Sequence, residues 1–152
     1  MVEYKYIQRP KSVDDAIKIL ENDILPVVDR YWTARGEKFY DHQLAFNVVA
    51  FANLWVVNGL VLVIAYENGK AVGIFVGIKF TPMMFPVPVL QVETCYGDSS
   101  DIEQGLYNYV MSISNIISVD EIWVTTDTNS LPASDSWVRG RTSEIVRYSK
   151  AE

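Results

Sequence analysis

Residues 60–80, LVLVIAYENGKAVGIFVGIKF, decide the fold of this chain. Two apolar runs rich in β-branched residues, Leu60–Tyr66 and Ala71–Phe80, flank the pair Asn68-Gly69. Asn and Gly adopt the positive φ angles of a type I′ turn more readily than other residues, so this pair between two such runs is among the strongest hairpin signals that a sequence carries. The stretch predicts two antiparallel strands joined by a two-residue turn.

Helical patterns precede this hairpin. After a short strand expected at Glu3–Gln8, the segment Ser12–Asp15 resembles a capping box with Asp in the place of Glu, and apolar residues follow at helical spacing. Pro26 lacks an N–H group, so it is expected to kink or break this helix near Leu25. A second helix is expected over residues 41–57, and because it is apolar on nearly every face we expect it to be deeply buried.

Loops and strands surround one long helix after the hairpin. Three prolines within Thr81–Pro88 exclude this segment from a central ladder, which makes it a loop or an edge. Val89–Tyr96 and Glu121–Thr126 are expected strands, and the capping box Ser100–Glu103 is expected to begin a helix that runs to Ile117. The expected closing elements are a short helix over residues 131–138 and a strand over residues 142–149.

This order of elements resembles the GNAT family, the GCN5-related N-acetyltransferases, over essentially the whole chain. The stretch Ile64–Phe75 looks like the family's second and third strands, Val89–Val110 looks like its strand-helix unit, and Ser136–Tyr148 looks like its closing segment. The resemblance implies a single α/β (α+β) domain over residues 1–152. Its mixed, mostly antiparallel sheet would be flanked by helices and would contain a central parallel strand pair that splays apart.

The composition excludes several classes of partner. A chain of 152 residues makes about one domain. Its net charge of −6 and pI near 4.8 disfavour binding to nucleic acid or to an anionic membrane. Residues 44–66 carry no charge, but asparagines and a glycine interrupt them, which favours a buried helix and strand over a membrane span. The single cysteine fits a reducing compartment, so we expect a cytoplasmic protein, or a virion component if the chain is phage-encoded.

The resemblance also implies a cofactor site. In the family, acyl-CoA lies where two neighbouring parallel strands splay apart, and its pyrophosphate binds a loop of the form Arg/Gln-x-x-Gly-x-Gly/Ala that opens the central helix. The matching stretch, Tyr96–Glu103, keeps only Gly97 of these glycines and has no basic residue. Asp98, Asp101 and Glu103 crowd the helix start instead.

Two interpretations of this loop stay open. An ordinary capped helix explains the acidic residues, because carboxylates in a first turn complement the helix dipole. Alternatively, backbone N–H groups from Gly97 to Asp101 hold the phosphates against the repulsion of the carboxylates. The residues that would bind the cofactor are Tyr96, Gly97, Ser99 and Ser100. Because basic and glycine residues are missing, we expect acetyl-CoA to bind weakly or not at all.

Glu93 lies on the strand that often carries a general-base glutamate in the family. Strict alternation along Val89–Tyr96 places it on the same face as Gln91 and Cys95, which is the more polar face. A carboxylate there could accept the proton of an attacking amine. The alternative is a solvent-facing carboxylate on a half-exposed sheet.

The general acid that the resemblance implies is missing. The family uses a tyrosine four residues before a Gly-Phe pair, whereas here Gly140 is followed by Arg141 and the position four before it is Ser136. Tyr107 and Tyr109 remain as donors, although Tyr109 falls on an apolar helical stripe that favours a place in the core.

Cys95 and His42 are far apart in sequence and carry no motif for a nucleophile and its base. A buried inert thiol explains Cys95 better, and the position of His42 at a helix start suits a surface residue. One His and one Cys cannot supply a zinc site, and Asp98 and Asp101 lack calcium-loop spacing, so no metal is expected.

Met83, Met84 and Phe85 form the best candidate for binding a partner. A proline-stiffened apolar loop loses little entropy on docking, and Met adapts to irregular surfaces. The alternative is a loop that folds back onto the core.

Two hypotheses of function follow. The first, which we favour here, is a GNAT-fold protein with a degraded CoA site that binds another protein chain through residues 81–88, such as a component of a phage virion or assembly. The second is an acyl-CoA-dependent N-acetyltransferase with a divergent cofactor loop.

Overall fold

The computed structural model describes residues 1–34, 47–84 and 86–124 of the chain. In chain order the elements are β1 (Val2–Tyr6), α1 (Val13–Ile19), the π-helix η1 (Leu20–Ile24), α2 (Leu25–Ala34), α3 (Val48–Val56), β2 (Leu60–Glu67), β3 (Lys70–Phe80), β4 (Val89–Gly97), α4 (Ser100–Ser112), α5 (Ser114–Ile117) and β5 (Glu121–Val124). The closing helix and strand expected after residue 124 lie outside the described residues, as do the acid position Ser136 and the resemblance of the tail.

One five-stranded sheet organises the described chain, in the order β1-β2-β3-β4-β5. Neighbouring strands run antiparallel except β4 and β5, which run parallel, with Val89 opposite Glu121 and Val92 opposite Val124. A parallel pair needs a crossover connection, and α4 and α5 supply it. The predicted mixed, mostly antiparallel sheet with one parallel pair is therefore confirmed.

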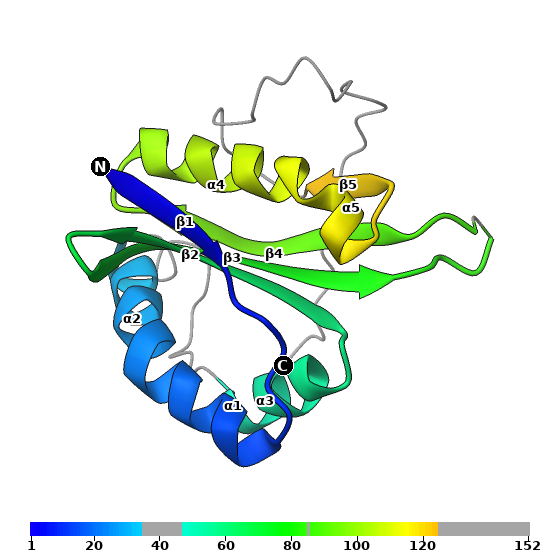
Figure 1. The fold of residues 1–152 in the computed structure, drawn as a ribbon, viewed down its shortest axis with the longest axis horizontal. Coiled ribbons are helices and arrows are strands. Elements are labelled where there is room, and N and C mark those ends of the chain that lie inside the picture. Colours follow the sequence, from blue (N-terminus) through cyan, green and yellow to red (C-terminus); the bar gives the residue numbers. More distant parts are fainter. Residues whose placement is uncertain (35–46, 85, 125–152) are drawn as a thin grey trace, which may run out of the picture.

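Helices cover both faces of this sheet (Figure 1). The segments α1, η1, α2 and α3 lie on one face, and α4 with α5 lies on the other. Each face has its own apolar core, because alternate residues of a strand point to opposite faces. In β3, for example, Ile74 and Val76 pack under α1–α3, whereas Phe75 packs under α4.

The predicted hairpin is confirmed. Asn68 and Gly69 have φ angles of 52° and 76°, and the flanking residues Glu67 and Lys70 pair across the turn. Positive φ at both central residues matches the right-handed twist of the strands, which explains why this pair joins β2 to β3 with two residues.

Pro26 changes the N-terminal helix without ending it. Ser12 caps α1 as expected, its Oγ accepting a hydrogen bond from the Asp15 amide over 3.1 Å. The helix then widens into the π-turn η1, whose last bond runs from the Leu25 amide to the Leu20 carbonyl. Since proline cannot donate a backbone hydrogen bond and crowds the preceding turn, the wider turn accommodates Pro26 where a break or kink was expected.

The expected deep burial of the second helix is wrong. Helix α3 begins after Asn47, whose side chain accepts a hydrogen bond from the Ala50 amide over 3.0 Å, and the expected residues 41–46 lie outside the described part. Only Ala52 and Trp55 of α3 are buried, whereas Val49 is 58% and Leu54 38% exposed. The helix packs on α1 and the near end of β2, so only one of its apolar sides finds a partner in the described chain. None of the described helices has the length and apolar character needed to cross a bilayer.

Candidate functional site

A β-bulge at Glu93 sets the geometry of the site. Val76 pairs with Thr94 and the next residue, Gly77, pairs with Val92, so Glu93 is one residue more than β3 can match. A bulge interrupts the alternation of side chains between the two faces. Glu93 and Thr94 consequently both line the α1–α3 face, while Cys95 packs against the core under α4. The expectation that Glu93 shares a face with Cys95, opposite Thr94, is wrong for this reason.

Glu93 borders a cavity of about 320 Å³ between α2, α3 and the sheet. The described residues that line it are mostly apolar. They are Val28, Asn47, Ala50, Phe51, Leu54, Leu60, Ile74, Val76, Ile78, Glu93 and Thr94. Among them Glu93 alone is ionisable, and it is exposed. The arrangement places one carboxylate at the edge of an apolar hollow.

The bulge also follows directly on the parallel pairing. The described ladder between β4 and β5 covers Val89–Val92, and Glu93 is the next residue of β4. Glu93 thus directly follows the described part of the parallel ladder, and β3 continues to pair with β4 as far as Gly97.

Hydrogen bonds already occupy much of the β4–α4 loop. The amide of Gly97 donates to Glu103 Oε1 over 3.4 Å, and the amide of Asp98 donates to the Val72 carbonyl over 2.9 Å. Ser99 is the N-cap of α4, and its Oγ accepts from the Ile102 amide over 3.3 Å.

The expected capping box Ser100–Glu103 is not formed, because the N-cap is Ser99 and the residue three positions after it is Ile102. The backbone of Ser99 is extended, which lets its hydroxyl reach the first turn of α4. Glu103 is only 3% exposed, and its side chain reaches back to Gly97 instead of to the capping serine. A serine of this loop thus caps α4, as the capped-helix interpretation requires. Whether Tyr96, Gly97, Ser99 and Ser100 also bind a cofactor stays a prediction.

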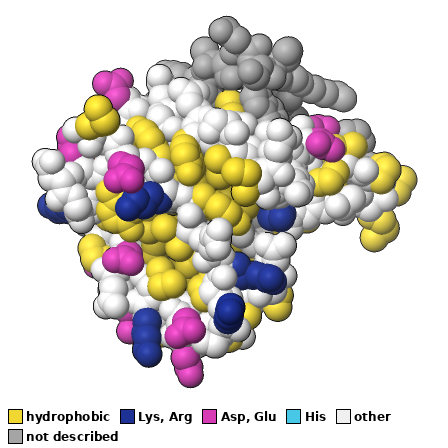
Figure 2. Space-filling view, viewed as in Figure 1, with side chains coloured by type: hydrophobic (Ala, Val, Ile, Leu, Met, Phe, Trp, Pro, Cys, Tyr) yellow, Lys and Arg dark blue, Asp and Glu magenta, His cyan; other side chains and the backbone are white. Residues whose placement is uncertain are grey.

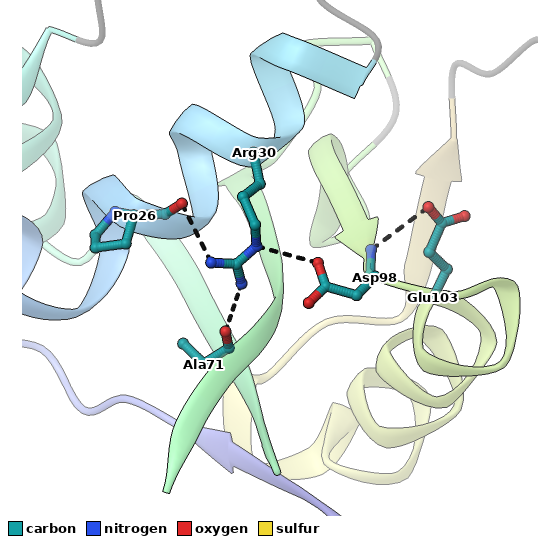
Figure 3. A network of polar contacts seen from close by, with 6 residues as sticks. Pro26, Arg30, Ala71, Asp98 and Glu103 are labelled. Carbon is teal, nitrogen blue, oxygen red and sulfur yellow. Dashed lines mark hydrogen bonds and ion pairs between the residues drawn. The ribbon is translucent and has the colours of Figure 1, made fainter.

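Arg30 is the residue near this loop that the sequence did not reveal. It lies on α2, and its Nε donates to Asp98 Oδ1 over 3.2 Å although the two residues are 68 positions apart (Figure 3). The same guanidinium donates to the carbonyls of Ala71 and Pro26. Only the tertiary fold brings α2 to the loop, so no local pattern could have found this contact. A positive group thus stands beside a loop that has none of its own.

The other candidate donors lie on the far side of the sheet from Glu93. Tyr107 of α4 is buried between this helix and the sheet, with its ring edge-on to Phe75 at a centroid distance of 5.9 Å. The hydroxyl of Tyr109 accepts a weak hydrogen bond from the Tyr6 amide over 3.4 Å, and its ring packs against the same core. The structure therefore does not bring either tyrosine to Glu93.

The thiol of Cys95 is less buried than the sequence predicted. Cys95 is half-buried, with Sγ 3.7 Å from the Glu103 carbonyl oxygen, and His42 lies outside the described residues. Within residues 1–34, 47–84 and 86–124, no group of three or more His, Cys, Asp or Glu side chains is placed to hold a metal ion.

The β3–β4 loop projects from one end of the molecule (Figure 1). Met83 is 96% and Met84 92% exposed, while Phe85 lies outside the described residues. Figure 2 shows apolar side chains at this projecting end. The two methionines do not fold back onto the core, and what covers them stays a prediction.

Comparison with known proteins gives the fold a family name. No protein-family model and no curated protein sequence matches the chain. Among solved structures, a ribosomal-protein-alanine N-acetyltransferase from Brucella melitensis biovar Abortus 2308 is similar at a TM-score of 0.59 and 13% identity, over 98% of this chain and 100% of that one.

Two further acetyltransferases match over nearly their whole length. An aminoglycoside acetyltransferase from an uncultured soil metagenomic sample, in complex with sisomicin, has a TM-score of 0.62 at 11% identity, over 95% of this chain and 96% of that one. A predicted acetyltransferase with acetyl-CoA from Clostridium acetobutylicum has a TM-score of 0.56 at 13% identity, over 93% and 96%. At such low sequence identities, the structural similarity establishes a shared fold and nothing beyond it. That fold is the GNAT fold.

Proposed function

We propose that this GNAT-fold chain is an acyl-CoA-dependent N-acyltransferase with Glu93 as its general base. One observation carries the proposal. Glu93 lines the apolar cavity at the bulge of β4, and the bulge sets Thr94 on the same face beside it. Bulges commonly re-aim a side chain beside an active site. This reverses the preference that the loop sequence gave to a protein-binding role.

The β4–α4 loop fits the phosphates of acyl-CoA better than its sequence suggests. Of its three carboxylates, Glu103 is turned inward to Gly97 and Asp98 is paired with Arg30. A guanidinium suits phosphate because its planar donors match phosphate oxygens. We propose that Arg30 and the backbone at Ser99 and Ser100 hold these phosphates. The bound group would supply an activated thioester carbonyl.

The protein's own part in the reaction is proton transfer and exclusion of water. Glu93 would accept the proton of the attacking amine nitrogen, which leaves the nitrogen lone pair free to attack. The apolar walls of the cavity would keep bulk water from the acyl donor. Neither Tyr107 nor Tyr109 lies on this face, so neither is assigned as the general acid.

The test measures acetyl transfer from acetyl-CoA to a panel of amines. Release of the CoA thiol reports the rate, and mass spectrometry detects the acetylated amine. Glu93→Gln should lower kcat/KM by about 10²–10⁴ while leaving the dissociation constant of acetyl-CoA unchanged. Glu67→Gln is the matched control, because Glu67 is also an exposed carboxylate on the sheet but lies at the distant hairpin. Turnover that survives Glu93→Gln would remove Glu93 from the mechanism. Failure of calorimetry to detect acetyl-CoA binding would reject the enzymatic proposal.

A second candidate function rests on the exposed methionines. Met83 and Met84 present large apolar side chains to solvent on a projecting loop, and interfaces normally cover such surface. A chain that binds another protein through Thr81–Pro88, such as an assembly or virion component, would explain this exposure. Acetyl transfer by the isolated chain separates the two candidates, since an assembly component does not require it.

A further inference from the structure

We infer that the cavity beside Glu93 accepts a small amine carried on an apolar body, such as an arylalkylamine or a short alkylamine. The inference rests on the proposed function for the transfer step, but the binding it describes does not need acyl-CoA. It names the class of acceptor, which the fold leaves open.

The walls of the cavity select an apolar ligand. Val28 of α2, Phe51 and Leu54 of α3, and Ile74, Val76 and Ile78 of β3 surround the space. Leu54 is 38% exposed, so an apolar side chain is open to water on one wall. A ligand that covers it gains the free energy of burying apolar surface. A volume of about 320 Å³ is at the small end of ligand pockets, which suits one aromatic ring or a short alkyl chain.

The charge at the cavity selects a cation. Glu93 is the only ionisable residue among those described in the lining, and neither Lys nor Arg is among them. An ammonium group placed against the carboxylate would gain a charge-assisted hydrogen bond. Because the bulge sets Thr94 on the same face, its hydroxyl offers a second polar contact beside the carboxylate.

The described lining offers few polar partners to a highly hydroxylated amine. Besides Glu93 and Thr94, the described lining has one polar side chain, Asn47, and its side-chain oxygen already caps α3. Hydroxyl groups buried against the remaining apolar walls would lose their hydrogen bonds to water without replacement. The described walls therefore favour an apolar amine over a polyhydroxylated aminosugar.

The experiment measures binding to the full chain without cofactor, by calorimetry or by NMR of the ligand. The probes are 2-phenylethylamine, its neutral counterpart 2-phenylethanol, and the polar amine glucosamine. We expect 2-phenylethylamine to bind about tenfold or more tightly than 2-phenylethanol, because only the amine pairs with Glu93. Glucosamine should not bind measurably.

Two variants test the location of the ligand. Glu93→Gln should remove the preference for the amine over the alcohol, whereas Glu67→Gln should keep it. Ala50→Phe should fill the cavity and weaken both ligands, and Ala50 is exposed, so the fold can accommodate the larger side chain. Unchanged amine binding in folded Glu93→Gln, or tighter binding of glucosamine than of 2-phenylethylamine, would overturn the inference.

The outcomes also separate this inference from the proposed function. Cavity-dependent amine binding without any acetyl transfer would support the ligand class and reject the enzyme. Acetyl transfer to glucosamine but not to 2-phenylethylamine would support the enzyme and overturn the ligand class.

Discussion

Arg30 sets the charge of the β4–α4 loop. Its ion pair with Asp98 leaves the two side chains 32% and 36% exposed, so solvent screens the attraction and the pair stabilises the fold by no more than about 1 kcal/mol. The guanidinium is held in place by three acceptors, the Asp98 carboxylate and the carbonyls of Ala71 and Pro26 (Figure 3).

Replacement of Asp98 tests whether this guanidinium serves an anion. Asp98→Asn removes a negative charge and releases Arg30 Nε, so acetyl-CoA should bind up to about fivefold more tightly. Arg30→Met should weaken the same binding. Isothermal titration calorimetry at low ionic strength measures both effects.

Ionic strength and a distant carboxylate provide the controls for Asp98→Asn. High salt should reduce the difference between wild type and variant, since the interaction is electrostatic. Asp120→Asn changes the net charge equally at the opposite end of β4, where the Asp120 amide donates to the Pro88 carbonyl, and should leave binding unaltered. Weaker binding by Asp98→Asn would mean that Asp98 positions Arg30 for the ligand and does not compete with it.

At the scale of the element, helix α4 depends on a glycine. A Cβ at Gly105 would overlap the ring and hydroxyl of Tyr4, which stacks on Tyr109 with the ring centroids 6.0 Å apart. The glycine costs helix propensity, but it lets β1 and α4 approach each other closely.

Gly105→Ala should lower the free energy of unfolding by about 1–3 kcal/mol, because overpacking outweighs the gain in helix propensity. In a Tyr4→Ala background the same substitution should instead raise it by about 1 kcal/mol, the propensity difference alone. Urea denaturation of the four proteins of this cycle measures the change of sign. A stabilising effect in the wild-type background would show that Tyr4 moves aside freely.

Local sequence patterns predicted the elements whose causes are local. The Asn68-Gly69 turn, the cap at Ser12 and the helix that connects β4 to β5 all follow from residues adjacent in sequence. The burial of α3 does not follow from its own sequence, because an apolar helix is buried only where other elements cover it. The bulge at Glu93 was missed for a related reason, since it is a property of pairing with β3 that β4 alone does not encode.

At the scale of the whole molecule, the sheet separates two sets of side chains. Glu93 and the cavity lie on the face covered by α2 and α3, whereas Cys95 and the α4 residues Tyr107 and Tyr109 belong to the core on the other face. Sequence reasoning found Glu93 from the resemblance but not the cavity or Arg30, since both arise from α2 and α3 folding back over the sheet. Such contacts join residues tens of positions apart and leave no periodic signal.

The projecting loop makes a prediction about association. If it binds another copy of the chain, replacement of Met83, Met84 and Phe85 by Ser should abolish self-association in sedimentation velocity. The melting temperature should hardly change, because Met83 and Met84 are almost fully exposed in the chain by itself. Unfolding of the variant would assign the loop to the core, and association that persists would place the interface elsewhere.

The bulge in β4 determines how the sheet would respond to the insertion or deletion of one residue. Removal of Glu93 alone would let Thr94 follow Val92 in the ladder and keep every pairing with β3 on both sides of the gap, because Glu93 is the residue that β3 does not match. Loss of the one codon for Glu93 would therefore remove the carboxylate from the site and leave a regular strand in an otherwise unchanged sheet. In a lineage that carries this sheet, acquisition or loss of the proposed base needs a single in-frame event, without redesign of the core.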